Sequence, residues 1–352
     1  MGTDELKKEF PQNEIIVDKY GKPSVMVYVK KFYLDDVIDG AEHIPHPAFI
    51  VDGKELDGIY ISKFQNVIID GNAYSLPGLD PATNINFDSA LSACLSKGDG
   101  FHLMSAIEWG AIALWCQKNG WLPYGNNDVG KDIREEKSVA KISYLNEEKG
   151  ICRTATGSGP VEWSHNRQAD GIYDLNANVW EWMGGLRLVF GELQVLPNNN
   201  GASARYSQSS SSDDWCAIDG TSGAFIKPDG NGRTKNSVKL DYIDGRWMYV
   251  TDELSSLSAS IRFGDFADVS AHTSICKRAK ELLYSLGCLP CRDGYDYHGV
   301  SLYANNGEAE RIAFRGGRYS QGLNTGVFKT CLDDPRSYSG DAVGFRSAYY
   351  KV

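Results

Sequence analysis

Residues 311–350 read RIAFRGGRYSQGLNTGVFKTCLDDPRSYSGDAVGFRSAYY. Two kinds of position are interleaved in this stretch. Glycines and internal residues such as Phe314, Val327 and Phe345 are suited to backbone turns and to core packing. The positions between them carry polar, charged and aromatic side chains without a repeating pattern. A regular scaffold with such a mixed surface is typical of a recognition face, because Tyr and small polar side chains make adaptable contacts.

We therefore predict that the irregular positions form a ligand-binding surface. These positions are Arg318, Tyr319, Ser320, Gln321, Leu323, Asn324, Lys329, Cys331, Asp333, Asp334, Tyr338 and Asp341. The alternative is an ordinary solvated surface loop. Arg and Tyr are enriched at binding hot spots, which favours recognition.

The same stretch resembles the variable region of proteins that are diversified by retroelements. The matching motifs are RGGRY at 315–319, Gly322, GVF at 326–328 and GFRSA at 344–348. The resemblance implies an α+β structure, the C-type lectin fold of the formylglycine-generating-enzyme type, with short helices around small antiparallel sheets and much irregular structure. It also implies that the irregular positions derive mostly from Asn codons whose adenines are randomised. Most of the residues found here can be reached in that way, whereas Gln321 and Lys329 cannot.

A second motif, GIYDLNANVWEW at 171–182, resembles the core segment of formylglycine-generating and related enzymes. Ala177 stands where that family usually has Gly. In the enzymes this segment wraps a calcium ion, which prefers hard oxygen ligands. The resemblance implies that the ligands here are the side chains of Asp174 and Glu181 and the carbonyls of Ala177 and Val179. The alternative is that the two carboxylates accept backbone hydrogen bonds in a tight turn without a metal.

The catalytic residues of the related enzymes have no counterpart in this sequence. Carried over by position, the copper-binding cysteine pair falls on Gln321 and Gly326, which can neither form a thiolate nor bind a soft metal. The six histidines do not match the helical pattern of the iron-dependent sulfoxide synthases. The resemblance thus implies a protein that binds and does not catalyse. The alternatives are an oxidase-like enzyme of the formylglycine-generating type with an altered metal site, and a structural virion protein whose C-terminal face binds nothing.

The eight cysteines are scattered, and only Cys288 and Cys291 are closely spaced. With His272 and Cys276, which lie at i and i+4 on a predicted helix, they have the ligand types of a tetrahedral zinc site. The alternative is a set of reduced, buried thiols.

Composition restricts the partners. The formal net charge of −10 argues against binding to nucleic acid, which depends on clustered Lys and Arg. No apolar run approaches the ~20 residues of a membrane span, and the first residues contain no apolar signal-peptide core. We expect a protein or glycan ligand on a cell surface, and a location on a phage tail or a bacterial surface. The sequence does not decide the oligomeric state.

The remaining elements follow from local patterns. We predict a flexible leader over residues 1–17 and a single domain over 18–352. Strands are predicted at 24–33, 47–51 and 58–64, and hairpins at 186–196 and 237–252. Helices are predicted after the caps Asn86 and Ser105 and over 271–286. Residues 142–167 have no clear period and are predicted to be a loop.

Overall fold

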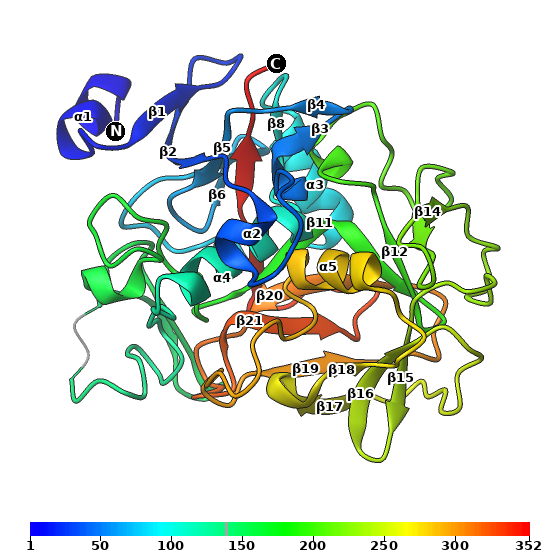
Figure 1. Cartoon of the computed structure of the whole chain (residues 1–352). Helices are drawn as coiled ribbons and strands as arrows, with labels where there is room; N and C mark the ends of the chain where they lie inside the picture. Colours follow the sequence, from blue (N-terminus) through cyan, green and yellow to red (C-terminus); the bar gives the residue numbers. More distant parts are fainter. Residues whose placement is uncertain (138–139) are drawn as a thin grey trace.

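The computed structural model describes residues 1–137 and 140–352 (Figure 1). Its helices are short and lie against sheets in which most strand pairs are antiparallel. The helices are α1 (Thr3–Glu9), α2 (Leu34–Val37), α3 (Phe87–Leu95), α4 (Ala106–Lys118) and α5 (Lys277–Ser285). The fold is therefore of the α+β class, as predicted. Within the described residues, no helix combines the length and the apolar character that a membrane crossing requires.

A five-stranded sheet joins the two ends of the chain. Its order is β1-β2-β5-β23-β8. The strands are β1 (Glu14–Val17), β2 (Pro23–Lys30), β5 (Gly58–Ser62), β8 (Phe101–Leu103) and β23 (Ser347–Tyr349). All neighbours are antiparallel, and Ala348 lies opposite both Ile61 and His102. The C-terminal strand is thus held from both sides, which fixes the end of the segment 311–350.

A second, twelve-stranded sheet follows the order β17-β19-β21-β20-β11-β12-β15-β16-β18, with β13, β14 and β22 beside this path. Its strands are β11 (Trp180–Val189), β12 (Glu192–Val195), β13 (Cys216–Ile218), β14 (Phe225–Ile226), β15 (Lys239–Ile243), β16 (Arg246–Val250), β17 (Arg262–Asp265), β18 (Ser270–Ala271), β19 (Ser301–Ala304), β20 (Arg311–Gly316), β21 (Gly326–Leu332) and β22 (Val343–Phe345). The pairs β11–β22, β16–β18 and β19–β21 are parallel. The two conspicuous motifs of the sequence meet here, because β11 contains the WEW residues and pairs with both β20 and β22.

Three two-stranded hairpins complete the fold. They are β3 (Ile50–Val51) with β4 (Lys54–Glu55), β6 (Val67–Ile69) with β7 (Asn72–Tyr74), and β9 (Ile142–Asn146) with β10 (Ile151–Thr154). The predicted hairpin at 237–252 is present as β15 and β16. Its turn residues Asp244 and Gly245 both have positive φ, 49° and 78°, as a type I′ turn requires.

The two predicted N-terminal helix caps are confirmed. Asn86 accepts the N–H of Ser89 at 2.9 Å in front of α3. Ser105 and Glu108 form a reciprocal capping box in front of α4, with distances of 3.2 and 2.9 Å. Helix α4 is buried along nearly its entire length and contacts α5 and β21 (Figure 1). The buried α4 therefore supports the strands that carry the C-terminal segment.

Three local predictions are wrong. The leader is ordered: β1 pairs with β2, and Leu6 of α1 is buried against Phe64 and Trp163. The third helix begins at Lys277 and not at 271, because residues 272–276 form a turn in which the carbonyl of His272 accepts the N–H of Ile275. The predicted loop 142–167 contains the hairpin β9–β10. Contacts with distant residues order the leader, whereas a local turn shortens the helix and a local hairpin replaces the loop.

The burial of His46 and His165 predicts that the stability of the protein depends on pH. His46 Nδ1 accepts the N–H of Ala48 at 3.2 Å, and His165 Nδ1 accepts the N–H of Ile172 at 2.9 Å. Burial lowers the pKa of both side chains from 6.5 to about 3. The unfolded chain therefore takes up these protons first as the pH falls. The contribution of these two histidines to stability is full above pH 6.5 and is lost between pH 6.5 and about 3.

We expect each histidine to contribute a slope of about 1.4 kcal/mol per pH unit in this range. His165→Asn keeps an acceptor for the Ile172 N–H and cannot be protonated. Urea unfolding of the wild type and the variant at a series of pH values measures the difference. The two stability curves should converge towards low pH; parallel curves would show that His165 is not kept neutral by the fold.

Candidate functional site

The loop between β20 and β21, residues 317–325, carries the first group of predicted contact residues. It is fixed by backbone hydrogen bonds to two other segments. Tyr319 N–H donates to Asn178 O at 3.2 Å, and Gly322 N–H donates to Asn127 O at 2.9 Å. At Gly317 the φ is 97°, and a Cβ would lie 2.4 Å from Thr325 Cγ2. The backbone of this loop is therefore held mainly by residues that are not among the predicted contacts; Gln321 is an exception, because its Oε1 accepts the N–H of Arg318 at 3.1 Å.

Nine of the twelve predicted contact residues are at least partly accessible. Arg318, Ser320, Leu323 and Tyr338 are exposed, with Leu323 at 48% and Tyr338 at 40%. The partly exposed residues are Gln321, Asn324, Asp333, Asp334 and Asp341. Burial raises the pKa of Tyr338, and the nearby Arg318 guanidinium opposes the rise. The loop 317–325 and the segment 333–341 thus present their side chains close to each other.

The other three, Tyr319, Lys329 and Cys331, are buried, so the prediction that they lie on an open face is corrected. Tyr319 is 3% exposed and packs with Ile151 and Ala342. Lys329 and Cys331 lie on β21, which pairs with β19 on one side and β20 on the other. All residues of β21 are buried. A central strand that is covered on both faces has no exposed alternate positions.

Lys329 forms a polar cluster with the predicted contact residue Asn324 and with Ser301 and Tyr303, which the sequence analysis did not select. Its Nζ donates to Ser301 Oγ and, at 2.6 Å, to Asn324 Oδ1. The same Nζ lies 3.8 Å from the centre of the Tyr303 ring, whose hydroxyl accepts from Asn324 Nδ2 at 2.9 Å. Burial lowers the pKa of Lys329 to about 7.

Tyr303 also stacks on Phe263, with ring centres 5.6 Å apart, and Phe263 is 63% exposed. Strand β17, which carries Phe263, is next to β19 in the sheet. The partly exposed Tyr303 and the exposed Phe263 therefore extend the surface beyond the C-terminal segment. The sequence analysis did not select either residue as a contact, because Tyr303 stands between the apolar Leu302 and Ala304 and Phe263 lies far from the C-terminal segment.

Cys331, Asp333 and Asp334 are the only group of three potential metal ligands among residues 1–137 and 140–352. The Cys331 thiol donates to Asp333 Oδ1. Burial, followed by the charge of Asp333, raises the pKa of the Cys331 thiol well above its ordinary value. The thiol therefore stays protonated at neutral pH. A protonated, buried thiol is a poor nucleophile and a poor metal ligand.

The predicted zinc ligands do not come together in the part of the chain that the structure describes. His272 Nδ1 contacts Ser274 Oγ at 2.9 Å, and Cys276 is the residue before α5 rather than a helical residue. Cys288 is contacted by Arg315 at 3.2 Å, and Cys291 donates to Gln117 Oε1 at 3.0 Å. The four residues satisfy separate partners, so the alternative of reduced thiols is the better description.

The predicted calcium ligands also depart from the expected arrangement. The carbonyls of Ala177 and Val179 do converge, together with Glu181 Oε1. Asp174, however, contributes its backbone carbonyl, while its carboxylate accepts the N–H of Gly157 at 2.8 Å. Glu181 is paired with Arg346, and both side chains are fully buried. The only carboxylate among the converging oxygens, Glu181, is already neutralised by Arg346. The Asp174 carboxylate, whose Oδ1 has no hydrogen-bond partner among the described residues, is not one of them, so the oxygen set as it stands does not fit calcium.

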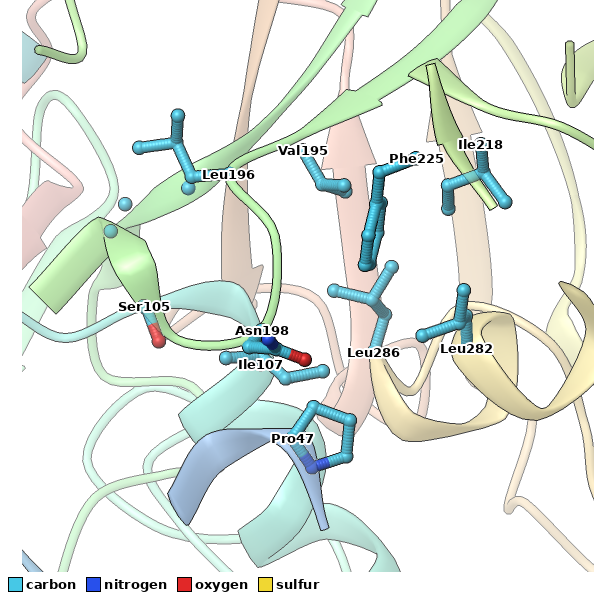
Figure 2. A pocket seen from close by; sticks show the side chains of 13 residues that line it. Pro47, Ser105, Ile107, Val195, Leu196, Asn198, Ile218, Phe225, Leu282 and Leu286 are labelled. Carbon is cyan, nitrogen blue, oxygen red and sulfur yellow. The ribbon is translucent and has the colours of Figure 1, made fainter. Parts of the chain in front are cut away.

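An apolar pocket is lined by residues of α4, β12, β14 and the end of α5 (Figure 2). Ile107, Val195, Phe225 and Leu286 point into it, and its volume is about 20 Å³, enough for a water molecule. The hydroxyl of Ser105 at its edge is already used in the capping box. The pocket offers neither space nor reactive groups for a substrate.

No family model and no curated protein sequence matches the chain. Two solved structures match nearly the whole chain at low sequence identity. The first is Treponema denticola variable protein 1, which is 11% identical, with 96% of this chain and 98% of that chain covered at a TM-score of 0.33. The second is PvdO from Pseudomonas aeruginosa, which is 13% identical over the same shares of the chains, also at a TM-score of 0.33. At these values the likeness concerns the fold alone.

Proposed function

We propose that this protein is a non-catalytic recognition protein whose C-terminal surface is diversified by a retroelement. Its partner is a protein or glycan on a cell surface, and the protein is displayed on a phage tail or on a bacterial surface. Arg318 and Tyr338 are its main contact residues, because a guanidinium and a phenol give large, adaptable contacts at binding hot spots.

The observation that supports the proposal is that residues 311–350 contain two classes of side chain: buried ones that fix the backbone and exposed ones on the loops. Arg315 and Arg346 are fully buried and hold carbonyl or carboxylate groups of the interior. Arg318, Ser320 and Tyr338 extend outwards from loops. Side chains on the loops can therefore change without loss of the buried contacts that fix the backbone.

The segment 333–341 is anchored in the same way as the loop 317–325. Arg336 forms two hydrogen bonds with Glu310, at 2.6 and 2.9 Å, and one with Asp88 at 2.7 Å. Arg153 donates to the carbonyl of Asp341 at 2.9 Å. These constant residues lie outside the irregular positions or between them. Such a rigid frame reduces the loss of entropy on binding.

The genetic part of the proposal is tested by the DNA next to the coding region. A reverse-transcriptase gene and a near-copy of the 3′ coding end should be present, and the copy should differ only at adenines. Isolates should vary at Arg318, Ser320, Asn324 and Tyr338, and not at Arg315 or Arg346. Isolates that are invariant at the first four positions would contradict diversification.

The binding part is tested by alanine variants. We expect Arg318→Ala and Tyr338→Ala to change the free energy of unfolding by less than about 0.5 kcal/mol. Each should weaken ligand binding by about 30-fold, which corresponds to the ~2 kcal/mol of a hot spot. The ligand is first selected from a glycan array and a panel of purified cell-surface proteins, and binding is then measured by calorimetry.

Tyr319→Ala is the matched control within the same loop. Because Tyr319 is buried, this variant should lose about 3 kcal/mol of stability, the lower end for large aromatic deletions. Urea unfolding measures this difference. If Tyr338→Ala lost as much stability as Tyr319→Ala, Tyr338 would be a packing residue and not a contact residue.

A further inference from the structure

The oxygen cage formed by residues 174–181 is centred on a protein atom. The carbonyls of Asp174, Ala177 and Val179 lie 3.2, 3.2 and 3.0 Å from Gln65 Nε2, and Glu181 Oε1 lies 3.1 Å from it. Gln65 follows strand β5 and is fully buried. The side-chain amide therefore lies where the resemblance to the enzymes places a cation.

The dimensions of the cage match hydrogen bonds and not metal–ligand bonds. Calcium holds its oxygen ligands at 2.3–2.6 Å. The four oxygens surround Gln65 Nε2 at 3.0–3.2 Å, a distance typical of N–H···O hydrogen bonds, and the two amide hydrogens reach them as shared, three-centre bonds. A cation at this position would require Gln65 to leave and the three carbonyls to move inwards.

The orientation of the Gln65 amide is fixed by a chain of other amides. The N–H of Gly130 donates to Asn126 Oδ1 at 2.7 Å, and Asn126 Nδ2 donates to Asn178 Oδ1 at 3.0 Å. Asn178 Oδ1 also accepts the backbone N–H of Thr154 at 2.9 Å. Asn178 Nδ2 then donates to Gln65 Oε1 at 2.9 Å. A backbone N–H can only donate, so the oxygen of Asn126 faces Gly130 and its nitrogen faces Asn178. The nitrogen of Asn178 in turn faces the oxygen of Gln65, and the Gln65 nitrogen therefore faces the cage.

The charge balance agrees with this arrangement. Glu181 is the only carboxylate in the cage, and Arg346 Nε and an Arg346 terminal nitrogen both bind it at 2.6 Å. The pair is neutral as a whole and fully buried. A neutral amide donor fits such a cage. The buried Asp174 carboxylate is not among the four cage oxygens; burial raises its pKa to about 6, and its Oδ1 has no hydrogen-bond partner among the described residues. Even with Asp174 ionised, a divalent cation would leave one uncompensated positive charge in the interior.

We propose that the Gln65 amide replaces the calcium ion in this protein, so that the segment 174–181 and the strands paired with it are held without a metal. The proposal does not rest on the proposed recognition function. In this proposal the carboxamide of residue 65 supplies the hydrogen-bond donors for the cage oxygens. A carboxylate at the same position would instead make the cage a cation site.

The test uses the full chain, with calcium chloride as the probe. After treatment with a chelator, the wild type should show no heat of calcium binding in titration calorimetry, and its melting temperature should be the same in calcium and in chelator. Stoichiometric calcium binding, or a melting temperature that rises with calcium, would overturn the proposal. This measurement decides the question even if a variant does not fold.

Gln65→Glu tests the assignment of the residue. In chelator this variant should melt well below the wild type, because a carboxylate faces three carbonyls and Glu181. Calcium should raise its melting temperature by several degrees and should bind at one ion per chain. A folded Gln65→Glu protein without a calcium response would contradict the placement of residue 65 at the cation position.

Gln208→Glu is the matched control. Gln208 is also buried, and its amide donates to Gly201 O at 2.9 Å and accepts the N–H of Gly185 at 2.8 Å, so it faces only one acceptor. This variant should lose stability and should not respond to calcium. A calcium response in Gln208→Glu equal to that of Gln65→Glu would show a nonspecific effect and would also refute the assignment.

Discussion

Replacement of Arg346 by Met is expected to lower the free energy of unfolding by about 3–5 kcal/mol, the usual penalty when one partner of a buried ion pair is removed. The guanidinium binds Glu181 at two positions and also donates to the carbonyls of Ser62 and Tyr173 at 3.0 Å. Without it, the Glu181 carboxylate remains charged in the interior. Urea unfolding followed by tryptophan fluorescence measures the loss.

Two further variants show whether the loss of stability comes from the unpaired charge of Glu181. Arg346→Met combined with Glu181→Gln removes both charges, and a neutral amide still offers an acceptor to Gln65, so much of the stability should return. Arg205→Met removes an arginine whose side chain is 77% exposed, and should change stability by less than about 0.5 kcal/mol. If Arg346→Met were as mild as Arg205→Met, the pair would not hold β11 to the C-terminal segment.

Gly110→Ala is expected to have the second large effect, a loss of about 3 kcal/mol, at the upper end for overpacking. A Cβ at this position of α4 would lie 2.0 Å from Ser285 O and 2.7 Å from Leu286 C. Both are backbone atoms at the end of α5, so neither can rotate away. The shift would reach Arg315, which donates to the carbonyls of Leu286 and Gly287.

Whether Gly110→Ala lowers or raises the free energy of unfolding shows whether packing or helix propensity dominates at this position. By propensity alone, Gly to Ala within a helix stabilises by about 1 kcal/mol. Ser92→Ala at an exposed position of α3 is the control and should be neutral or slightly stabilising. A stabilised Gly110→Ala protein in urea unfolding would show that α4 and α5 are not held in close contact.

Local sequence patterns correctly predicted the features whose contacts join residues close together in the sequence. The Ser105–Glu108 capping box and the Asp244-Gly245 turn involve residues at most three positions apart. The burial of α4 followed from apolar residues on all of its sides. Such features depend on backbone geometry and on side chains of one segment, so they can be predicted without knowledge of the fold.

The candidate contact residues were predicted only in part. Alternation of constant and irregular positions identified Arg318, Ser320 and Tyr338 as outward-facing residues. It failed for Lys329, because β21 has strands on both sides and is covered on both faces. It failed for Tyr319 because the residues that cover this ring, Ile151 and Ala342, come from other parts of the chain.

The sequence by itself determined the elements with strong local signals, the α+β class, and part of the division of residues 311–350 into frame and irregular positions. Only the tertiary structure decided which positions of that segment reach solvent, and that Gln65 fills the cage of residues 174–181. Gln65 is 109 to 116 positions away from the oxygens it contacts. Contacts over such distances leave no periodic trace in a single sequence, because they arise only when the sheets bring the segments together.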